Sequence, residues 1–419
     1  MSIKTDTNDE EIKYFNWSKL IIISLTTVLT GIYRDGFSSI FPFLQSDFNL
    51  SRAQLGLHST FFFFTSAIFA VFAGRLVDLK GSKWGLGFGL LLTGVLFALH
   101  SIIPSFTLIL ILSTITGFAV SINVPSASKS IIEWFPKTLR GTALGFLSAA
   151  LPAGGILGAL VLPFLSRSMG WRQAILFPSV FTVSYAFYIL YFYKEKRLDN
   201  DHFKNNGVNK ISLLKRFNKL FCNSELLSVS VFGFFLGATS ASIAAHFTLF
   251  LYLDYNLPMN VAGMIFAIVQ FGSFIGRIGW GIICDRLLKT NRRKTFLYTG
   301  FVFLFLSLII YIFSDRYILP MNLILILSFF IGFSGRGWTG LYLVSAAETV
   351  NEDDIGISTG FSLLFMRMGA MSMPPVFGYI ADLNGTYSVS WILLGFMMFL
   401  TSLIQYTLSK KKSKNDCKK

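Results

Sequence analysis

The feature that most constrains this chain is the recurrence of apolar windows about 20 residues long from one end to the other. A window of about 20 apolar residues matches the hydrocarbon thickness of a bilayer, so each window predicts a transmembrane helix. Of the residues, 53% are hydrophobic and only 14% are charged, whereas soluble domains carry roughly 25% charged residues. The pattern predicts an all-α polytopic membrane protein.

The windows number twelve, and one long loop separates six from six. This division predicts a cytosolic N-terminal tail (1–18), a six-helix bundle (19–193), a cytosolic linker (194–225), a second six-helix bundle (226–408) and a basic cytosolic C-terminal tail (409–419). The predicted spans are 19–44, 55–77, 84–103, 106–132, 141–166, 172–193, 226–253, 260–284, 295–313, 319–346, 356–381 and 388–408.

The distribution of basic residues predicts the orientation. With the N-terminus in the cytosol, 26 Lys and Arg residues fall in cytosolic tails and loops and four in outer loops. The positive-inside rule then predicts a multi-pass protein of the cytoplasmic (inner) membrane with both termini cytosolic. The net charge of +15 therefore indicates topology and affinity for anionic membrane lipid, not nucleic-acid binding. Residues 1–18 lack the pattern of a cleaved signal peptide, so we expect the first span to be an uncleaved anchor.

Within the linker, "KISLLKRFNKLF" places Ile211, Leu214, Phe217 and Phe221 at helical spacing, with lysines elsewhere around the helix. This pattern predicts an amphipathic helix on the cytosolic membrane surface. A disordered basic linker is the alternative.

The two halves of the chain resemble each other. "GRLVD" (74–78) follows the second predicted span, and "GIICDR" (281–286) follows the eighth. "GTALGF" (141–146) opens the fifth span, "GISTGF" (356–361) opens the eleventh, and a Gly-Phe pair recurs in spans four and ten. Three matches at corresponding spans indicate duplication, which is the usual architecture of secondary transporters.

The segment "GRLVDLKGSK" (74–83) resembles the loop motif of the major facilitator superfamily, and the second half carries a degenerate copy. The resemblance implies the major facilitator fold, with twelve transmembrane helices in two pseudo-symmetric six-helix bundles, a monomer, and a loop that acts as a cytosolic latch. Physically, Gly74 permits close helix approach, and Asp78 can cap a neighbouring helix or pair with a cation. The expected latch residues are Gly74, Arg75, Asp78, Gly81, Asp285 and Arg286.

Two further segments narrow the resemblance. "PSASKSIIEWFPKTLRGTALGF" (125–146) and "MGWR" (169–172) resemble the anion–cation symporters, which carry sugar acids and other organic anions. "FIGRIGWGIICDR" (274–286) resembles the eighth helix of oxalate–formate exchangers and monocarboxylate transporters, in which an arginine at the position of Arg277 binds the substrate carboxylate. The chain departs from the sugar-acid symporters in span four, where "GFAVSIN" lacks an embedded glutamate, and in span one, where their Asp-Arg order is reversed.

Six basic residues of the predicted spans are not assigned to a loop. Arg75 belongs to the loop motif, and the other five accompany one deep carboxylate, Asp35. Each buried cation costs roughly 2.5–3.5 kcal/mol at a bilayer centre unless it meets water, an acid or a ligand. The positive excess suits an anion in a water-filled cavity, and a guanidinium group matches a carboxylate bidentately. The predicted substrate contacts are Tyr33, Arg34, Lys129, Arg277, Arg336, Trp338 and Arg367, and the predicted proton-coupling residues are Asp35 and His246.

Each of these residues has a structural alternative. Arg34 either binds the anion or pairs internally with Asp35, which is either a proton carrier or a permanent counter-ion. Arg277 either binds substrate or supports the latch. The alternatives for Arg336 and Arg367 are hydrogen bonding between helices and packing against a helix end, respectively.

Lys129 and His246 have equally plain alternatives, and three further polar residues are not ranked. Lys129 can snorkel to the cytosolic interface. His246 either relays protons or is a hydrogen-bonded core histidine. Gln270, Asn123 and Tyr33 are plausible polar contacts that the sequence does not rank.

Several motifs are absent from the sequence. It has no Walker-type phosphate loop, no nucleophile elbow and no zinc-helix motif. The three cysteines, at 222, 284 and 417, lie at or near the predicted cytosolic side and form neither a disulfide framework nor a metal cluster. We therefore expect neither an ATP-driven pump nor an enzyme, and no cofactor.

Together these features predict a secondary active transporter that moves a small organic anion, a carboxylate or sugar acid, by alternating access with proton coupling. The alternatives are an anion exchanger for carboxylates, phosphate esters or inorganic anions, and a transporter-like receptor that does not transport. A multidrug exporter would favour buried acids over this basic excess.

Overall fold

The structure, a computed structural model, describes residues 16–136, 138–195, 220–221, 223–314, 319–350 and 355–416. Within these ranges the chain forms helices joined by short turns, and no strand. The predicted amphipathic helix of the linker falls almost entirely outside them. The helices are α2 (Trp17–Gly31), η1 (Ile32–Gly36), η2 (Phe37–Ile40), α3 (Phe41–Phe48), α4 (Arg52–Lys80), α5 (Ser82–Leu99), η3 (His100–Ile102), α6 (Phe106–Trp134), α7 (Arg140–Met169), α8 (Trp171–Phe192), α11 (Ser224–Leu253), α12 (Met259–Ile282), η4 (Ile283–Leu287), α13 (Arg292–Ser314), α14 (Met321–Arg336), α15 (Thr339–Ala347), α16 (Ile355–Asn384) and α17 (Ser388–Asp416).

Each predicted span coincides with one helix or with a run of consecutive helices. By length and composition, ten of the described helical segments can cross a membrane, or eleven if the bent α4 is one span. The remaining segment is α16, whose apolar content is lowered by Arg367, two prolines and several glycines and serines. The all-α membrane fold is thus confirmed, and the count of twelve crossings stays a prediction.

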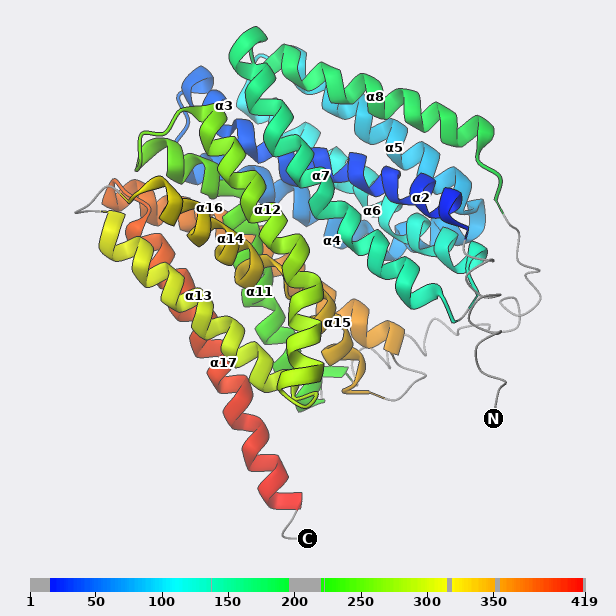
Figure 1. The fold of residues 1–419 in the computed structure, drawn as a ribbon. Helices are drawn as coiled ribbons and strands as arrows, with labels where there is room; N and C mark the ends of the chain where they lie inside the picture. Colours follow the sequence, from blue (N-terminus) through cyan, green and yellow to red (C-terminus); the bar gives the residue numbers. More distant parts are fainter. Residues whose placement is uncertain are drawn as a thin grey trace, which may run out of the picture.

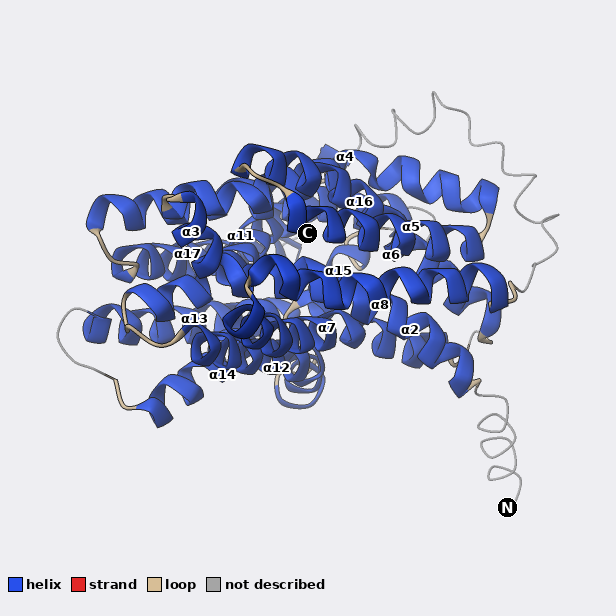
Figure 2. Ribbon diagram, turned by 90° about the horizontal axis from the view of Figure 1, so that it is seen from above, coloured by secondary structure: helices blue, strands red, loops and turns tan. Residues whose placement is uncertain are grey.

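The helices form two groups that meet along one seam. Figure 1 shows α2 to α8 on one side of the molecule and α11 to α17 on the other, and Figure 2, seen from above, shows α4 next to α16. Two helix pairs make most of the contact between the groups: α4 packs on α16, and α7 packs on α12. We call these groups the N-half and the C-half.

The first span is not a uniform helix. After α2, a π-helical turn (η1) carries Arg34 and Asp35, and a 3₁₀ turn (η2) follows before α3. Here the chain packs closely on α7, since a Cβ added to Gly36 would lie 2.7 Å from Cα of Gly158. Small residues permit such close helix contacts in membranes, and π turns are frequent at functional sites.

The tenth span is broken in its middle. α14 ends at Arg336, and α15 begins at Thr339. At the break, a Cβ on Gly337 would lie 2.6 Å from Cα of Gly276, so α12 runs directly against this point. The sequence predicted a single helix over 319–346, but the glycines around Arg336 accommodate two shorter ones.

Polar bonds tie the two halves together at the end of the molecule where α4 begins. The Asp382 carboxylate accepts hydrogen bonds from the backbone N–H groups of Arg52 (3.0 Å) and Ala53 (2.9 Å). The Arg52 guanidinium donates to the carbonyls of Ala381 and Gly385, each at 2.6 Å. We call this set of bonds the Arg52 seam. The predicted spans 19–44 and 55–77 leave Arg52 in the loop between them, so the sequence did not predict these bonds.

At the opposite end, which the sequence predicts to be cytosolic, the described ion pairs stay within one half. Lys129 lies 3.5 Å from Asp78 in the N-half, and Arg292 lies 2.5 Å from Glu348 in the C-half. A Cβ on Gly74 would meet nothing within 4 Å, so the close helix approach predicted there is not made in this structure and stays a prediction. A Cβ on the glycines at 141, 145, 281 and 360 would likewise meet nothing within 4 Å. Among the described residues, the halves are therefore joined at the Arg52 seam, and no ion pair joins them at the other end.

Candidate functional site

A buried ion pair joins the two halves at mid-span. Arg336 Nη2 lies 3.1 Å from Asp35 Oδ1, and the two residues are only 5% and 4% exposed. Arg336 Nη1 also donates to the Ser240 carbonyl at 2.8 Å. The ion pair of Asp35 is thus with Arg336 in the other half and not with its neighbour Arg34. Because removing one partner of a buried pair leaves an uncompensated charge, each residue strongly requires the other.

Two more arginines surround this pair. Arg277 Nη1, from α12, donates to the Ser148 carbonyl of α7 at 2.5 Å. The Arg34 guanidinium lies over the Phe63 ring, 5.4 Å from its centroid. The charges of Arg34, Arg277 and Arg336 all act on Asp35, so three cations share one carboxylate. We call these four residues the arginine cluster.

Arg367 extends the positive charge along the seam. Its Nη1 donates to the Ser66 carbonyl of α4 at 2.6 Å, so it bridges α16 and α4. Its guanidinium also lies close enough to that of Arg34 for the two positive charges to repel. The structure therefore groups four of the five predicted internal cations around the contact between the halves.

The structure places the fifth cation elsewhere. Lys129 Nζ donates to the Val77 carbonyl at 3.1 Å and lies beside Asp78. Lys129 is therefore part of the loop motif, and Asp78 pairs with a cation, which is one of its two predicted roles. Gly81 has φ +95, a conformation in which a side chain would be strained, and a Cβ there would lie 2.5 Å from the Glu195 carboxylate oxygens. Arg75, Asp285 and Arg286 are exposed at the same end of the molecule.

Tyr33 points into the N-half, away from the arginine cluster. Its hydroxyl donates to His100 Nε2 at 3.4 Å, because His100 Nδ1 donates to the Leu96 carbonyl at 2.7 Å. Phe37 stacks on the Tyr33 ring, and the buried His58 packs on Phe37. No sequence pattern distinguishes these two histidines, His58 and His100, from other core residues, so neither was predicted as a site residue.

Trp338 and His246 are also bonded internally. Trp338 Nε1 donates to the Gly335 carbonyl at 2.8 Å, which ends α14. His246 Nε2 donates to the Pro374 carbonyl at 2.8 Å, and Nδ1 accepts from the Tyr387 hydroxyl at 3.1 Å. With both ring nitrogens in use, the geometry of His246 matches its core alternative, and its proton-coupling role stays a prediction.

The other two unranked polar residues, besides Tyr33, differ in position. Asn123 donates to Thr30 Oγ1 at 3.3 Å within the N-half. Gln270, fully buried on α12, lies beside the arginine cluster: a Cβ added to Gly155 would be 2.4 Å from Gln270 Nε2 and 3.1 Å from Cβ of Asp35. Gln270 lies two helical turns before Arg277 on the same side of α12, and this spacing is the feature of the sequence that could have indicated it as a site residue.

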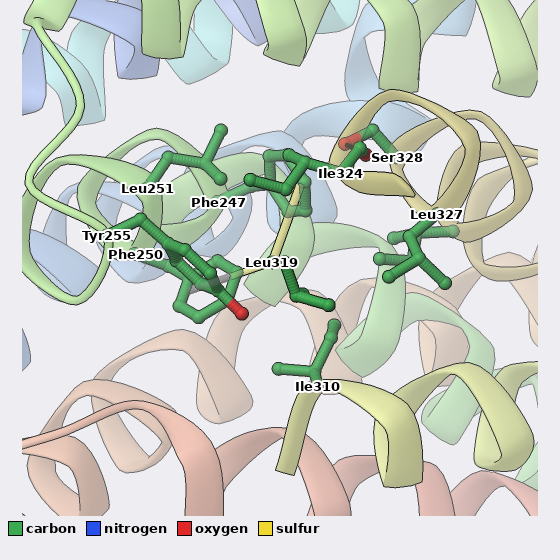
Figure 3. Close-up of a pocket in the computed structure, with 10 residues that line it drawn as sticks. Phe247, Phe250, Leu251, Tyr255, Ile310, Leu319, Ile324, Leu327 and Ser328 are labelled. Atoms are coloured by element: carbon green, nitrogen blue, oxygen red, sulfur yellow. Dashed lines mark hydrogen bonds between the residues drawn. The ribbon is translucent and has the colours of Figure 1, made fainter. Parts of the chain in front are cut away.

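A separate small pocket lies within the C-half between α11, α13 and α14 (Figure 3). Its lining is apolar apart from Tyr255 and Ser328, whose hydroxyl bonds the Ile324 carbonyl of its own helix at 2.6 Å. It therefore does not suit a small charged solute. Across the described residues, no group of His, Cys, Asp and Glu could hold a metal ion, and Cys284 is a buried free thiol.

Two helical halves that meet around a buried charged cluster in a multi-pass membrane protein have the architecture of a transport protein. The sequence profile of the Major Facilitator Superfamily matches residues 23–344. The chain therefore belongs to the major facilitator superfamily, as its loop motif and repeat predicted.

Individual proteins agree with this assignment. The chain is 22% identical to a hexuronate transporter of Bacillus subtilis, with 92% of each chain covered. It is also 22% identical to the membrane sensor protein UhpC of Salmonella typhimurium, over 87% of this chain and 86% of that one. Among solved structures, a bacterial homologue of the human lysosomal transporter Spinster superimposes with a TM-score of 0.70 at 14% identity, covering 94% of this chain and 96% of the other. The structural likeness shows the fold alone.

Proposed function

We propose that this protein carries a small organic anion, a carboxylate or sugar acid, across the cytoplasmic membrane. The observation that carries the proposal is the arginine cluster, in which three arginines share one buried aspartate at the contact between the halves. An anion between the halves would neutralise the remaining positive charge, and a guanidinium can hold a carboxylate with two parallel hydrogen bonds. The named activity of the Bacillus relative, hexuronate transport, supports the same substrate class.

Transport would proceed by alternating access, with the anion held at the arginine cluster while the halves rock about it. The asymmetry of the seam supports this mechanism. The halves are bonded at the Arg52 end, and the glycines at the other end face open space. We take the open end as cytosolic, with both termini on that side, and the protein as a monomer.

Uptake by purified protein in proteoliposomes tests the proposal. We expect accumulation of D-glucuronate or a related carboxylate, and loss of both uptake and binding in Arg277→Ala and Arg34→Ala. Arg140→Ala is the matched control, because Arg140 also donates to backbone carbonyls, those of Phe135 and Ile132, but outside the arginine cluster. Uptake of neutral sugars that persists in both arginine variants would overturn the proposed substrate class, and binding without any uptake would indicate a receptor.

We also propose that Asp35 carries the coupling proton, with His246 as a second candidate. Asp35 is a buried carboxylate beside the proposed anion site. An anion that binds Arg336 would weaken the ion pair between Arg336 and Asp35. We expect Asp35→Asn to lose accumulation driven by a pH gradient while it retains exchange of labelled for unlabelled substrate at equal pH. Gradient-driven accumulation at the wild-type rate in Asp35→Asn, with loss in His246→Gln, would transfer the role to His246.

A further inference from the structure

One face of α12 carries three polar side chains toward the contact between the halves. Gln270, Ser273 and Arg277 follow one another at intervals of three and four residues, which places them on one side of a helix. Gln270 faces Gly155 and Asp35, and Arg277 reaches the Ser148 carbonyl, so this side is directed at α7 and the first span.

These side chains have polar atoms that remain unused. Both Gln270 Nε2 and Gln270 Oε1, together with Ser273 Oγ and Arg277 Nε, are buried and have no hydrogen-bond partner among the described residues. A few other buried serine hydroxyls, such as those of Ser166 and Ser242, also lack a partner among the described residues, whereas Ser307 and Ser328 donate to a carbonyl of their own helix. Ser273 differs in its place, on the same side of α12 as Gln270 and Arg277. Since buried polar groups are nearly always bonded, a cluster of unbonded ones beside a charged site indicates a ligand surface.

The chemistry of these atoms limits the ligand. A guanidinium only donates hydrogen bonds, and a carboxylate only accepts them, so the arginines alone suffice for a simple carboxylate. The Gln270 carbonyl oxygen instead needs a donor, and its amide needs an acceptor. A ligand hydroxyl is both a donor and an acceptor, so it can satisfy the two groups of Gln270. The Ser273 hydroxyl is likewise a donor and an acceptor, and can bond a ligand hydroxyl in either direction.

We propose that Gln270 and Ser273 select hydroxylated carboxylates, such as sugar acids, over carboxylates without hydroxyl groups. The inference rests on the proposed function, since it assigns the carboxylate to the arginine cluster and the neighbouring hydroxyls to Gln270 and Ser273. A site built to bond a ligand hydroxyl discriminates against ligands that lack it, because its own buried polar groups are then left unpaired.

Binding to the purified full-length protein by isothermal titration calorimetry tests the inference with two ring carboxylates of similar size, D-glucuronate and cyclohexanecarboxylate. We expect the wild type to prefer D-glucuronate. Gln270→Met keeps the length of the side chain and removes the amide, so it should weaken D-glucuronate binding by about tenfold or more and leave cyclohexanecarboxylate binding within about threefold. Ser273→Ala should act in the same direction, so the test does not depend on one variant folding.

The chain offers a matched control in Gln405 on α17, another buried glutamine whose Nε2 and Oε1 have no partner in the described part of the chain. Gln405→Met should bind both compounds like the wild type. If Gln270→Met and Ser273→Ala keep the wild-type preference while Arg277→Ala abolishes binding, the inference is overturned and the proposed function stands. If the wild type binds neither carboxylate, both are overturned.

Discussion

At the scale of the residue, the pair between Asp35 and Arg336 is the most sensitive contact. We expect Arg336→Gln to lower the free energy of unfolding by about 3–5 kcal/mol, because it leaves a buried carboxylate without its direct partner. The loss should lie near the lower bound, since Arg34 and Arg277 also act on Asp35. Denaturation in detergent measures it, and Asp35→Asn combined with Arg336→Gln should recover most of the loss. A double variant no more stable than Arg336→Gln alone would contradict this pairing.

Two adjacent glycines on α7 should respond differently to alanine. At Gly154 a Cβ would lie 2.0 Å from the Val28 carbonyl oxygen, so Gly154→Ala forces α2 and α7 apart and should cost about 1–3 kcal/mol of stability. At Gly155 the nearest atom is the amide nitrogen of Gln270, at the end of a flexible side chain. Gly155→Ala should therefore fold normally and bind D-glucuronate more weakly. Thermal unfolding and calorimetry separate the two effects, and a destabilised Gly155→Ala with intact binding would refute the assignment.

The residue types of the site can be predicted from the sequence, but their partners cannot. Cations within apolar spans are costly, so residue type and position alone indicate Arg34, Arg277, Arg336 and Arg367 as candidates. That Asp35 pairs with a residue about 300 positions away depends on how two halves meet, which no local pattern records. Gln270 was not ranked for the same reason. An uncharged amide costs much less to bury in a membrane than a charge, so its position alone does not indicate a function until its neighbours are known.

At the scale of the element, the irregular turns carry the site. Arg336 ends α14 at a break where Gly337 touches Gly276 of α12, and Asp35 lies in the π turn η1. Apolar periodicity identified the spans that contain them but predicted uninterrupted helices. Hydrophobic windows report length and polarity, whereas a π turn or a helix break depends on close packing against another helix.

Substitution at the break tests its importance. In Gly337→Ala the added Cβ would lie 2.5 Å from the Phe333 carbonyl oxygen and 2.6 Å from Cα of Gly276. Because both are backbone atoms, α12 must shift relative to α14, which displaces Arg336 from Asp35. We expect D-glucuronate affinity to fall by about tenfold, equivalent to ~1.4 kcal/mol, as measured by calorimetry. Wild-type affinity in a folded Gly337→Ala would show that the break tolerates a side chain and does not position Arg336.

At the scale of the whole molecule, the Arg52 seam should determine which end is closed. Arg52→Ala removes two side-chain bonds to carbonyls of the C-half, those of Ala381 and Gly385. Losing about 2–3 kcal/mol would shift the ratio of the two states roughly 30- to 150-fold toward an opening at this end. Spin labels at Ser46 and Asn384, exposed in different halves, should report longer distances by pulsed electron resonance. Arg167→Ala is the control, since its single bond to Asn260 is longer, at 3.4 Å.

The opposite end allows a complementary test. Gly360 on α16 has no atom within 4 Å of an added Cβ, so Gly360→Leu should be accommodated in this state and bind D-glucuronate normally. If the ends of α4, α7, α12 and α16 must meet during transport, the leucine obstructs that step and uptake should fall by about tenfold or more. Uptake at the wild-type rate in proteoliposomes would show that these helix ends do not come together.

The glycines at the open end also bear on how variation in this chain is read. A position with no neighbours ordinarily accepts many residues, and a stability measurement on this state would rank Gly74, Gly145 and Gly360 among the most permissive sites. A transporter that visits a second arrangement gives such a position a second set of neighbours. In a mutational scan selected for growth on the transported compound, we therefore expect these uncrowded glycines to be as intolerant as the tightly packed Gly154, with the two kinds of position distinguished by whether the inactive variants still fold and bind.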